Sequence, residues 1–219
     1  SSRKQHVAIV GGGIAAAICA IKLVRAGKKV SLFCADASLA QGASGNEQAG
    51  FYPQLNAEAG TASQIYAHSF LYARQFYDQL LQQGHHFSHQ WCGVLQLCFN
   101  DNVNERYQNM MRNKTWPLSL VTWLDQEEAA TMAGVDIPCA SLYLPLGGWL
   151  SPPELIQACI QSAEKGDFTL ALNKRLVDIL QADAKGTKLA FNDTSSKDTS
   201  GGLKSSEVLA DIVILACGA

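Results

Sequence analysis

The chain has 219 residues, of which 47% are hydrophobic and 16% charged. This composition excludes an intrinsically disordered chain, and no apolar run approaches the roughly 18 residues that a membrane-spanning helix needs. The formal net charge of −2 excludes the strongly positive overall field of proteins that bind nucleic acids along their whole surface.

The N-terminal part of the chain carries the pattern of a strand–helix–strand unit. Residues 7–10 form a short apolar run, which predicts a buried parallel strand. Apolar residues then recur at helical spacing over 14–26, and Gly27 predicts the end of this helix. Residues 30–34 predict the second strand.

A glycine pattern, Gly11-x-Gly13-x-x-Ala16, joins the first predicted strand to the helix. In this position it is typical of dinucleotide-binding sites, because Gly11 allows a tight turn, Gly13 lets backbone approach a pyrophosphate, and Ala16 permits close packing of helix on strand. The N-terminus of the helix offers N–H groups and a partial positive charge to the phosphates. We therefore predict a nucleotide site, the alternative being a glycine-rich turn that binds nothing.

The end of the second predicted strand departs from the usual pattern. An acidic residue normally accepts hydrogen bonds from the ribose hydroxyls there. Cys34 holds this position, and a thiol is a poor acceptor, whereas Asp36 follows two residues later. Either Asp36 reaches the ribose from a slightly extended loop, or water and backbone groups bind it.

A second cluster of small residues, 42–46, favours a flavin over a simple nicotinamide cofactor. A nicotinamide-dependent dehydrogenase would continue with alternating strands and helices, but here a loop and a long amphipathic helix over 61–83 follow. We expect Ser44 and backbone amides of the cluster near the pyrophosphate and the flavin. A late apolar strand, 212–216, is predicted to lie beside the first glycine turn.

The remaining patterns predict an α/β chain with a Rossmann-like fold and an inserted α+β region. Asp125 and Ser151 are predicted helix N-caps, the latter followed by Glu154 in a capping pattern. Further helices are expected at 105–113 and 152–165, further strands at 91–99, 142–145, 168–172, 176–181 and 188–191, and a polar hairpin loop at 192–206.

These residues resemble the D-amino-acid-oxidase/glycine-oxidase superfamily of FAD enzymes. Within it, the chain is similar to the FAD-dependent half of a family of bifunctional bacterial tRNA-modifying enzymes, and the similarity covers nearly the whole chain. The segments that carry it are 7–15, Cys34-Ala35-Asp36, 42–46 with Gln48, Tyr52-Pro53, and 147–150 with Pro153.

The resemblance implies FAD as the cofactor and a set of residues that contact it. Backbone groups of Leu176 or Val177 are expected to contact the adenine, with plain strand pairing as the alternative. The end of the last strand is expected to form a second wall of the site. The complete set is Gly11, Gly13, Ile14, Ala15, Ala16, Cys34, Ala35, Asp36, Ala43, Ser44, Gly45, Asn46, Gln48, Leu176, Val177, Ala216 and Gly218.

The resemblance also implies a reaction and partners. FAD would oxidise the carboxymethyl carbon of 5-carboxymethylaminomethyl-2-thiouridine at the wobble position of a tRNA, and hydrolysis would leave the aminomethyl nucleoside and glyoxylate. In that family a methyltransferase domain precedes this half in the same chain. Two alternatives stay open: an oxidase of free glycine or D-amino acids, and a nucleotide-binding fragment without activity.

We expect a FAD-binding domain of residues 1–60 and 165–219 around a substrate-domain segment, 61–164. The chain stops just after its last predicted strand, so we expect a longer protein with about a hundred further residues.

Catalytic residues stay unassigned, because hydride transfer to a flavin requires positioning rather than an obligatory acid or base. A substrate carboxylate would need a cationic clamp, for which Arg74, Arg106 and Arg112 are candidates by composition. His85, His86 and His89 are expected to be solvated turn residues and no metal site is predicted. Seven cysteines without Cys-x-x-Cys spacing predict free thiols in a reducing compartment, the cytoplasm.

Overall fold

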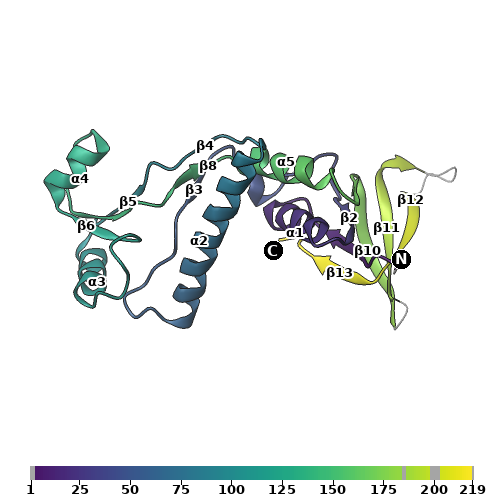
Figure 1. Cartoon of the computed structure of the whole chain (residues 1–219), viewed down its shortest axis with the longest axis horizontal. Coiled ribbons are helices and arrows are strands. Elements are labelled where there is room, and N and C mark those ends of the chain that lie inside the picture. Colours follow the sequence, from purple (N-terminus) through teal and green to yellow (C-terminus); the bar gives the residue numbers. More distant parts are fainter. Residues whose placement is uncertain (1–2, 184–185, 198–202, 219) are drawn as a thin grey trace. The chain divides into compact units, whose positions relative to one another are not determined.

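The computed structural model describes residues 3–183, 186–197 and 203–218, which form two compact units. Unit 1 comprises Ser1–Glu47, Leu80–Ser88 and Ser151–Ala219, and unit 2 comprises Gln48–Gln79 and His89–Leu150. These bounds differ from the predicted ones, since helix α5 (Pro152–Ala163) lies against α1 (Ile14–Arg25) in unit 1 rather than in the inserted segment (Figure 1).

Unit 1 is built on a parallel sheet of four strands. Its order is β13 (Ile212–Leu215), β1 (His6–Val10), β2 (Lys29–Phe33) and β9 (Phe168–Ala171). The register aligns Val10 with Leu215 on one side and with Phe33 on the other. The predicted position of the last strand beside the first is therefore confirmed.

One face of this sheet packs against a second, antiparallel sheet. Because side chains alternate along a strand, Val7 and Ile9 point to the face opposite Ala8 and Val10, and all four are buried. Ala8 and Val10 pack against an antiparallel sheet. Its strands are β10 (Lys174–Asp183), β11 (Gly186–Lys197) and β12 (Leu203–Ala210).

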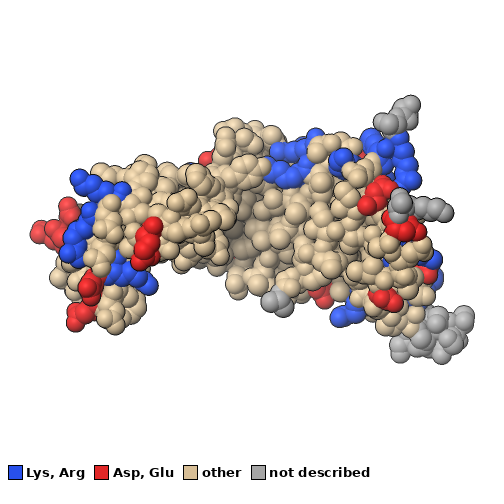
Figure 2. Space-filling model, turned by 90° about the horizontal axis from the view of Figure 1, so that it is seen from below, with Lys and Arg blue, Asp and Glu red and all other residues tan. Residues whose placement is uncertain are grey.

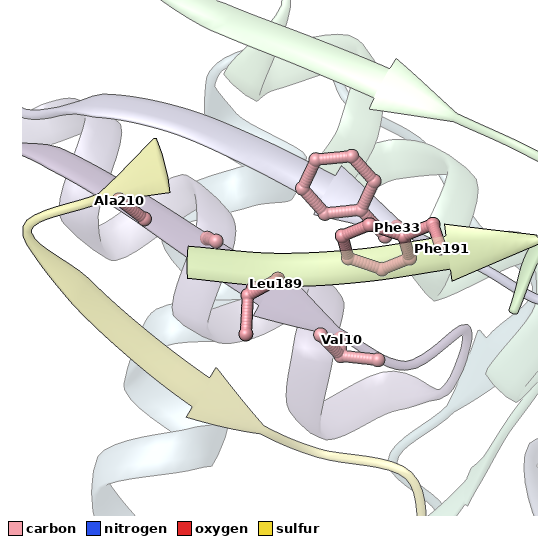
Figure 3. Packing of buried hydrophobic residues seen from close by; sticks show 6 residues of the cluster. Val10, Phe33, Leu189, Phe191 and Ala210 are labelled. Atoms are coloured by element: carbon pink, nitrogen blue, oxygen red, sulfur yellow. The ribbon is translucent and has the colours of Figure 1, made fainter. Parts of the chain in front are cut away.

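The core between the two sheets is small and apolar. Figure 3 shows the rings of Phe33 and Phe191 lying one over the other, with centroids 4.3 Å apart. Leu189 and Ala210 complete it from the antiparallel sheet. This packing fixes β2 against β11 close to the end of β2.

The predicted loop at 192–206 is wrong over most of its length. Residues 192–197 continue β11 and residues 203–206 begin β12, while 198–202 lie outside the described residues. These strand segments are polar because they extend beyond the buried core, so their composition resembles that of a loop.

Unit 2 holds two small antiparallel sheets and three helices. Met110, Val121, Leu142 and Leu144 form a buried cluster between α3 and the second sheet. The first sheet has the order β3 (Ala49–Phe51), β8 (Gly148–Leu150) and β4 (His89–Gln90). The second sheet has the order β5 (Val94–Leu97), β7 (Ser141–Leu144) and β6 (Thr122–Leu124). The helices are α2 (Thr61–Gln82, whose last residues belong to unit 1), α3 (Asp101–Arg112) and α4 (Gln126–Ala133).

The two predicted helix caps have different outcomes. Asp125 caps α4 in a capping box with Glu128, as predicted for the cap residue. Ser151 makes no side-chain cap on α5, and the Glu154 carboxylate instead accepts a hydrogen bond of 2.6 Å from the Ser88 backbone N–H. This bond lowers the pKa of Glu154.

None of the helices in the described part of the chain combines the length and the apolarity that crossing a membrane requires.

Candidate functional site

The carboxyl ends of three parallel strands meet at one edge of unit 1. The Gly11 N–H donates to the Phe33 carbonyl at 2.9 Å, and the Ala216 N–H donates to the Val10 carbonyl at 2.7 Å. The turns that follow β1, β2 and β13 are therefore neighbours. In open α/β sheets this edge is where ligands bind.

Gly11 lies against the residue that follows β13. Its φ is +144°, and a Cβ at this position would lie 2.1 Å from the Ala216 carbonyl oxygen. Only a residue without a side chain lets the first turn approach the end of β13 this closely. Predicted site residues Gly11 and Ala216 are thus brought into contact.

The N-terminus of α1 is bonded by a serine from a distant loop. Gly13 is the N-cap and provides no side-chain cap, and the first turn contains no acidic residue. The Ser44 hydroxyl accepts a hydrogen bond of 3.1 Å from the Ile14 N–H. A Cβ on Gly13 would lie 3.2 Å from the same hydroxyl oxygen. Ser44 and the glycine turn therefore form one polar cradle at the positive end of a helix dipole.

The loop that carries Ser44 is tied back to the glycine turn. The Ala40 N–H donates to the Gly12 carbonyl at 2.9 Å, and Ala43–Gly45 form a short 3₁₀ helix, η1. Ala43, Gly45 and Asn46 are exposed. These backbone contacts hold the loop beside the glycine turn.

Cys34 supports the glycine turn from behind. A Cβ on Gly12 would lie 2.5 Å from the Cys34 sulfur, and the thiol donates to the Ser38 carbonyl at 3.7 Å. The side chain is buried, and this burial raises the pKa of the thiol. Its sulfur is thus occupied with packing and a backbone acceptor.

Asp36 lies exposed on a loop that is anchored at several points. Its carbonyl oxygen accepts from the Asn173 N–H at 3.0 Å, and the Ala35 carbonyl accepts from the Thr194 hydroxyl at 3.0 Å. Asn173 has a φ of +57°, in the turn between β9 and β10. Local sequence patterns did not predict the roles of Asn173 and Thr194, and the only signal was an asparagine between two apolar strand patterns.

Val177 occupies an irregularity of β10. Leu176 pairs with Phe191 and Asp178 pairs with Ala190, so Val177 is an extra residue in its strand. Its side chain is 50% exposed, whereas Leu176 packs against the core. A bulged residue has backbone groups outside the ladder, and the contact of this backbone with an adenine stays a prediction.

The remaining predicted residues divide between the units. In unit 1, Ala15 is exposed, Ala16 is buried, and Gly218 is exposed with a φ of +79°. Gln48 belongs to unit 2, where it is exposed.

One protein family matches nearly the whole chain. A family model described as FAD dependent oxidoreductase matches residues 6–219. The chain belongs to this family. The predicted family, its FAD cofactor and the α/β fold are thereby confirmed.

Two curated relatives share the name tRNA 5-methylaminomethyl-2-thiouridine biosynthesis bifunctional protein MnmC. The protein from Pseudoalteromonas atlantica is 44% identical over 223 aligned residues, which cover 99% of this chain and 32% of the relative. The protein from Vibrio cholerae is 40% identical over 192 residues, which cover 87% of this chain and 28% of the relative. The chain thus spans about a third of the length of these relatives.

Solved structures with a similar fold include two glycine oxidases. The enzyme from Bacillus cereus has a TM-score of 0.76 at 20% identity, covering 98% of this chain and 55% of that one. The enzyme from Geobacillus kaustophilus has a TM-score of 0.75 at 24% identity, covering 99% and 56%. At these identities the similarity shows the fold.

Of the three arginines predicted as candidates for a carboxylate clamp, Arg74 already has several partners within the chain. It pairs with Asp78 at 3.3 Å, donates to the Leu146 carbonyl at 3.0 Å, and lies 4.2 Å from the centre of a Trp91 ring. Arg106 lines a polar recess on α3, and Arg112 donates to Asn109. Arg74 therefore acts within the packing of unit 2.

The expectation of three solvated histidines is wrong for His85. Its side chain is buried, and Nε2 lies 3.1 Å from the ammonium nitrogen of Lys165. Burial lowers the pKa of His85 most, and the nearby positive charges of Lys165 and Arg25 lower it further. His89 belongs to the other unit, and no metal-binding group of three His, Cys, Asp or Glu side chains occurs among the described residues.

Proposed function

We propose that unit 1 provides the FAD-binding part of an enzyme that removes the carboxymethyl group from 5-carboxymethylaminomethyl-2-thiouridine in tRNA, and that unit 2 contributes to substrate binding. The assignment of the substrate rests on the 44% identity, over 99% of the chain, to a relative named for the biosynthesis of 5-methylaminomethyl-2-thiouridine in tRNA.

The cradle at α1 fits a pyrophosphate. The helix end supplies N–H groups and positive potential without an acidic side chain to repel an anion. Ser44 accepts from Ile14, so its hydroxyl proton remains directed at another acceptor, for which a phosphate oxygen is suitable. The proposed pyrophosphate contacts are Gly11, Gly13, Ile14, Ala15, Ala16 and the η1 residues Ala43, Ser44, Gly45 and Asn46.

The ribose and adenine ends fit the neighbouring turns. Asp36 has an exposed carboxylate on an anchored loop, which suits it to accept from ribose hydroxyls. Cys34 and Ala35 hold that loop in place, and the bulged backbone of Val177, next to Leu176, is proposed for the adenine. Ala216 and Gly218 are proposed for the opposite side of the cradle, and Gln48 stays a predicted FAD contact.

Bound FAD supplies the hydride acceptor. In the proposed reaction, the substrate carbon between the secondary amine and the carboxylate loses a hydride, and the nitrogen lone pair forms a C=N bond. Water adds to this carbon, and the C–N bond then breaks to leave a primary amine and glyoxylate. The chain's contribution is to hold the acceptor rigidly, since hydride transfer depends on positioning.

The proposal includes the context of the reaction. The relatives are named bifunctional and are about three times as long as this chain, so we propose a methyltransferase domain N-terminal to it in the same protein. We propose a wobble uridine of tRNA as the substrate and the cytoplasm as the location of the reaction.

Glyoxylate release tests the proposal. The complete protein that carries this chain is incubated in air with tRNA that contains the carboxymethylaminomethyl nucleoside, or with free glycine. We expect glyoxylate and the aminomethyl nucleoside from the tRNA and none from glycine. Glyoxylate from glycine alone would favour the free amino-acid oxidase, and a purified protein without flavin absorption would favour a fragment without activity.

A further inference from the structure

Unit 2 contains a polar recess that is distinct from the proposed FAD cradle. It has a volume of about 340 Å³ and lies between α3 and the segment that contains Ala57. The polar side chains that line it are Glu58, Asn102, Glu105, Arg106, Asn109 and Asn113. This volume lies at the lower end of the range of small-ligand sites and suits one nucleoside-sized ligand.

The helix geometry places these amides on one face. Asn102, Arg106, Asn109 and Asn113 follow each other at steps of four, three and four residues, the spacing of a single helical face. The opposite wall is fixed, because the Thr115 hydroxyl donates to the Ala57 carbonyl and the Trp116 indole N–H donates to the Asn56 carbonyl, both at 2.8 Å. The recess is therefore formed by a helix and an anchored segment.

The charges of the recess argue against an anionic ligand. Two carboxylates, Glu58 and Glu105, and one guanidinium, Arg106, line the recess. A substrate carboxylate or a phosphate would be repelled by this excess of negative charge. The amides of asparagine both donate and accept, so the recess suits a neutral ligand with donors and acceptors side by side.

An unpaired guanine base has this arrangement. Its N1–H and amino group are donors that a carboxylate accepts, and its O6 and N7 are acceptors that Arg and amide groups contact. The Arg112 guanidinium donates to Asn109 Oδ1 at 2.7 Å, which orients this amide so that its NH₂ group is the donor for a ligand. Adenine lacks the N1–H donor, and the pyrimidines lack N7.

The rim of the recess carries cations that suit the flanking phosphates. Arg112 and Lys114 are exposed at the C-terminal end of α3, next to Asn113. Figure 2 shows Lys and Arg interspersed with Asp and Glu over the end of the molecule that holds α3 and α4. Local cations beside an acidic recess are consistent with a contact to one nucleotide rather than to a long duplex.

We propose that this recess binds one unpaired guanine of the tRNA and so helps to select the substrate; the proposal rests on the proposed function of the chain. Glu105 and Glu58 accept from the base, Asn102, Asn109 and Arg106 donate to it, and Arg112 and Lys114 contact the adjacent phosphates.

Binding of short RNA probes tests this assignment without catalysis. Fluorescently labelled pentaribonucleotides UUGUU, UUAUU and UUUUU are titrated with the complete protein, and anisotropy gives the Kd. We expect UUGUU to bind about fivefold more tightly than the other two, the lower end of the discrimination that one good base contact provides. In the N102A/N109A variant the three probes should bind equally.

Asn104→Ala is the matched control. Asn104 is an asparagine of the same helix, its side chain accepts from Gln108, and it does not line the recess. This variant should keep the guanine preference, and equal melting temperatures should show that all variants fold. Equal binding of the three probes to the wild-type protein, or a preference that survives in N102A/N109A, would refute the assignment. Wild-type protein that releases glyoxylate from tRNA but shows no guanine preference would leave the proposed function standing.

Discussion

The Ser44 hydroxyl oxygen lies 3.1 Å from the backbone nitrogen of Ile14, across 30 positions of sequence. This bond joins the loop between β2 and β3 to the first turn of α1. It brings together two segments that separately carry small-residue patterns, and it gives the helix N-terminus a hydroxyl that can turn its proton to a ligand.

Replacement of Ser44 by alanine should weaken FAD binding. The variant loses a hydrogen bond to a charged ligand, which is worth about 1.5–3 kcal/mol and corresponds to about a tenfold or greater rise in the Kd. Titration of the apoprotein of the complete protein with FAD, followed by flavin fluorescence, measures it. Ser38→Ala is the control, because its hydroxyl bonds to Gln41 in the same loop; an equal loss in both variants would contradict the role of Ser44.

Gly12 and Cys34 should show strong coupling in a double-mutant cycle. Gly12→Ala places a Cβ 2.5 Å from the Cys34 sulfur, and such overpacking costs about 1–3 kcal/mol. Cys34→Ala removes that sulfur and leaves the nearest Cys34 atom, its Cβ, at 3.6 Å. The double variant should therefore be more stable than the sum of the single effects predicts. Additive changes in the free energy of unfolding by urea would refute the close contact.

Gly11→Ala should be the most damaging change at the turn. The added Cβ would lie 2.1 Å from the Ala216 carbonyl oxygen at a φ of +144°. We expect a loss of at least about 2 kcal/mol in the free energy of unfolding, together with loss of bound FAD. Gly42→Ala is the comparison, since nothing lies within 4 Å of its Cβ position. Similar stability of both variants would show that β1 and β13 do not meet this way.

His85 should make the protein less stable in acid. Its pKa is lowered in the folded state by burial and by Lys165, while the unfolded chain keeps the ordinary value of 6.5. Below this value the unfolded state binds more protons than the folded state, so the free energy of unfolding falls as the pH falls. This contribution to the free energy of unfolding is fully present above pH 6.5 and is lost as the pH falls through the lowered pKa of the folded state.

Urea unfolding between about pH 5 and pH 7.5 measures this slope. His85→Gln removes the titrating group, so the variant should have a smaller slope over this range. His86→Gln is the control, because His86 is exposed. An unchanged slope in His85→Gln would mean that another group is responsible.

The nucleotide-binding edge could be predicted because its signals are local. The apolar run before Gly11, the spacing to Ala16 and the apolar run at 212–216 each fit within a few residues, and the structure places β1, α1 and β13 within one residue of the predicted ends. The run before Gly11 is buried on both faces of the sheet, so its composition leaves little choice of structure.

Other features depend on distant partners and were inaccessible to local patterns. Glu154 follows Ser151 at the spacing of a capping box, but its carboxylate instead accepts a hydrogen bond from the Ser88 N–H, 66 residues away. His85 follows a helix-ending glycine and was expected in solvent, whereas Lys165 and the surrounding core bury it. The long polar strands β11 and β12 form because each pairs with its neighbour in the sheet, with few buried side chains to mark them.

An anaerobic single-turnover reaction tests the proposed oxidation most directly. The complete, FAD-loaded protein is mixed without oxygen with tRNA that contains 5-carboxymethylaminomethyl-2-thiouridine, and flavin absorbance and glyoxylate are measured together. We expect the oxidised flavin band to disappear and one glyoxylate to form for each flavin reduced. A flavin that stays oxidised with this tRNA, or that is reduced by glycine alone, would rule out the proposed reaction.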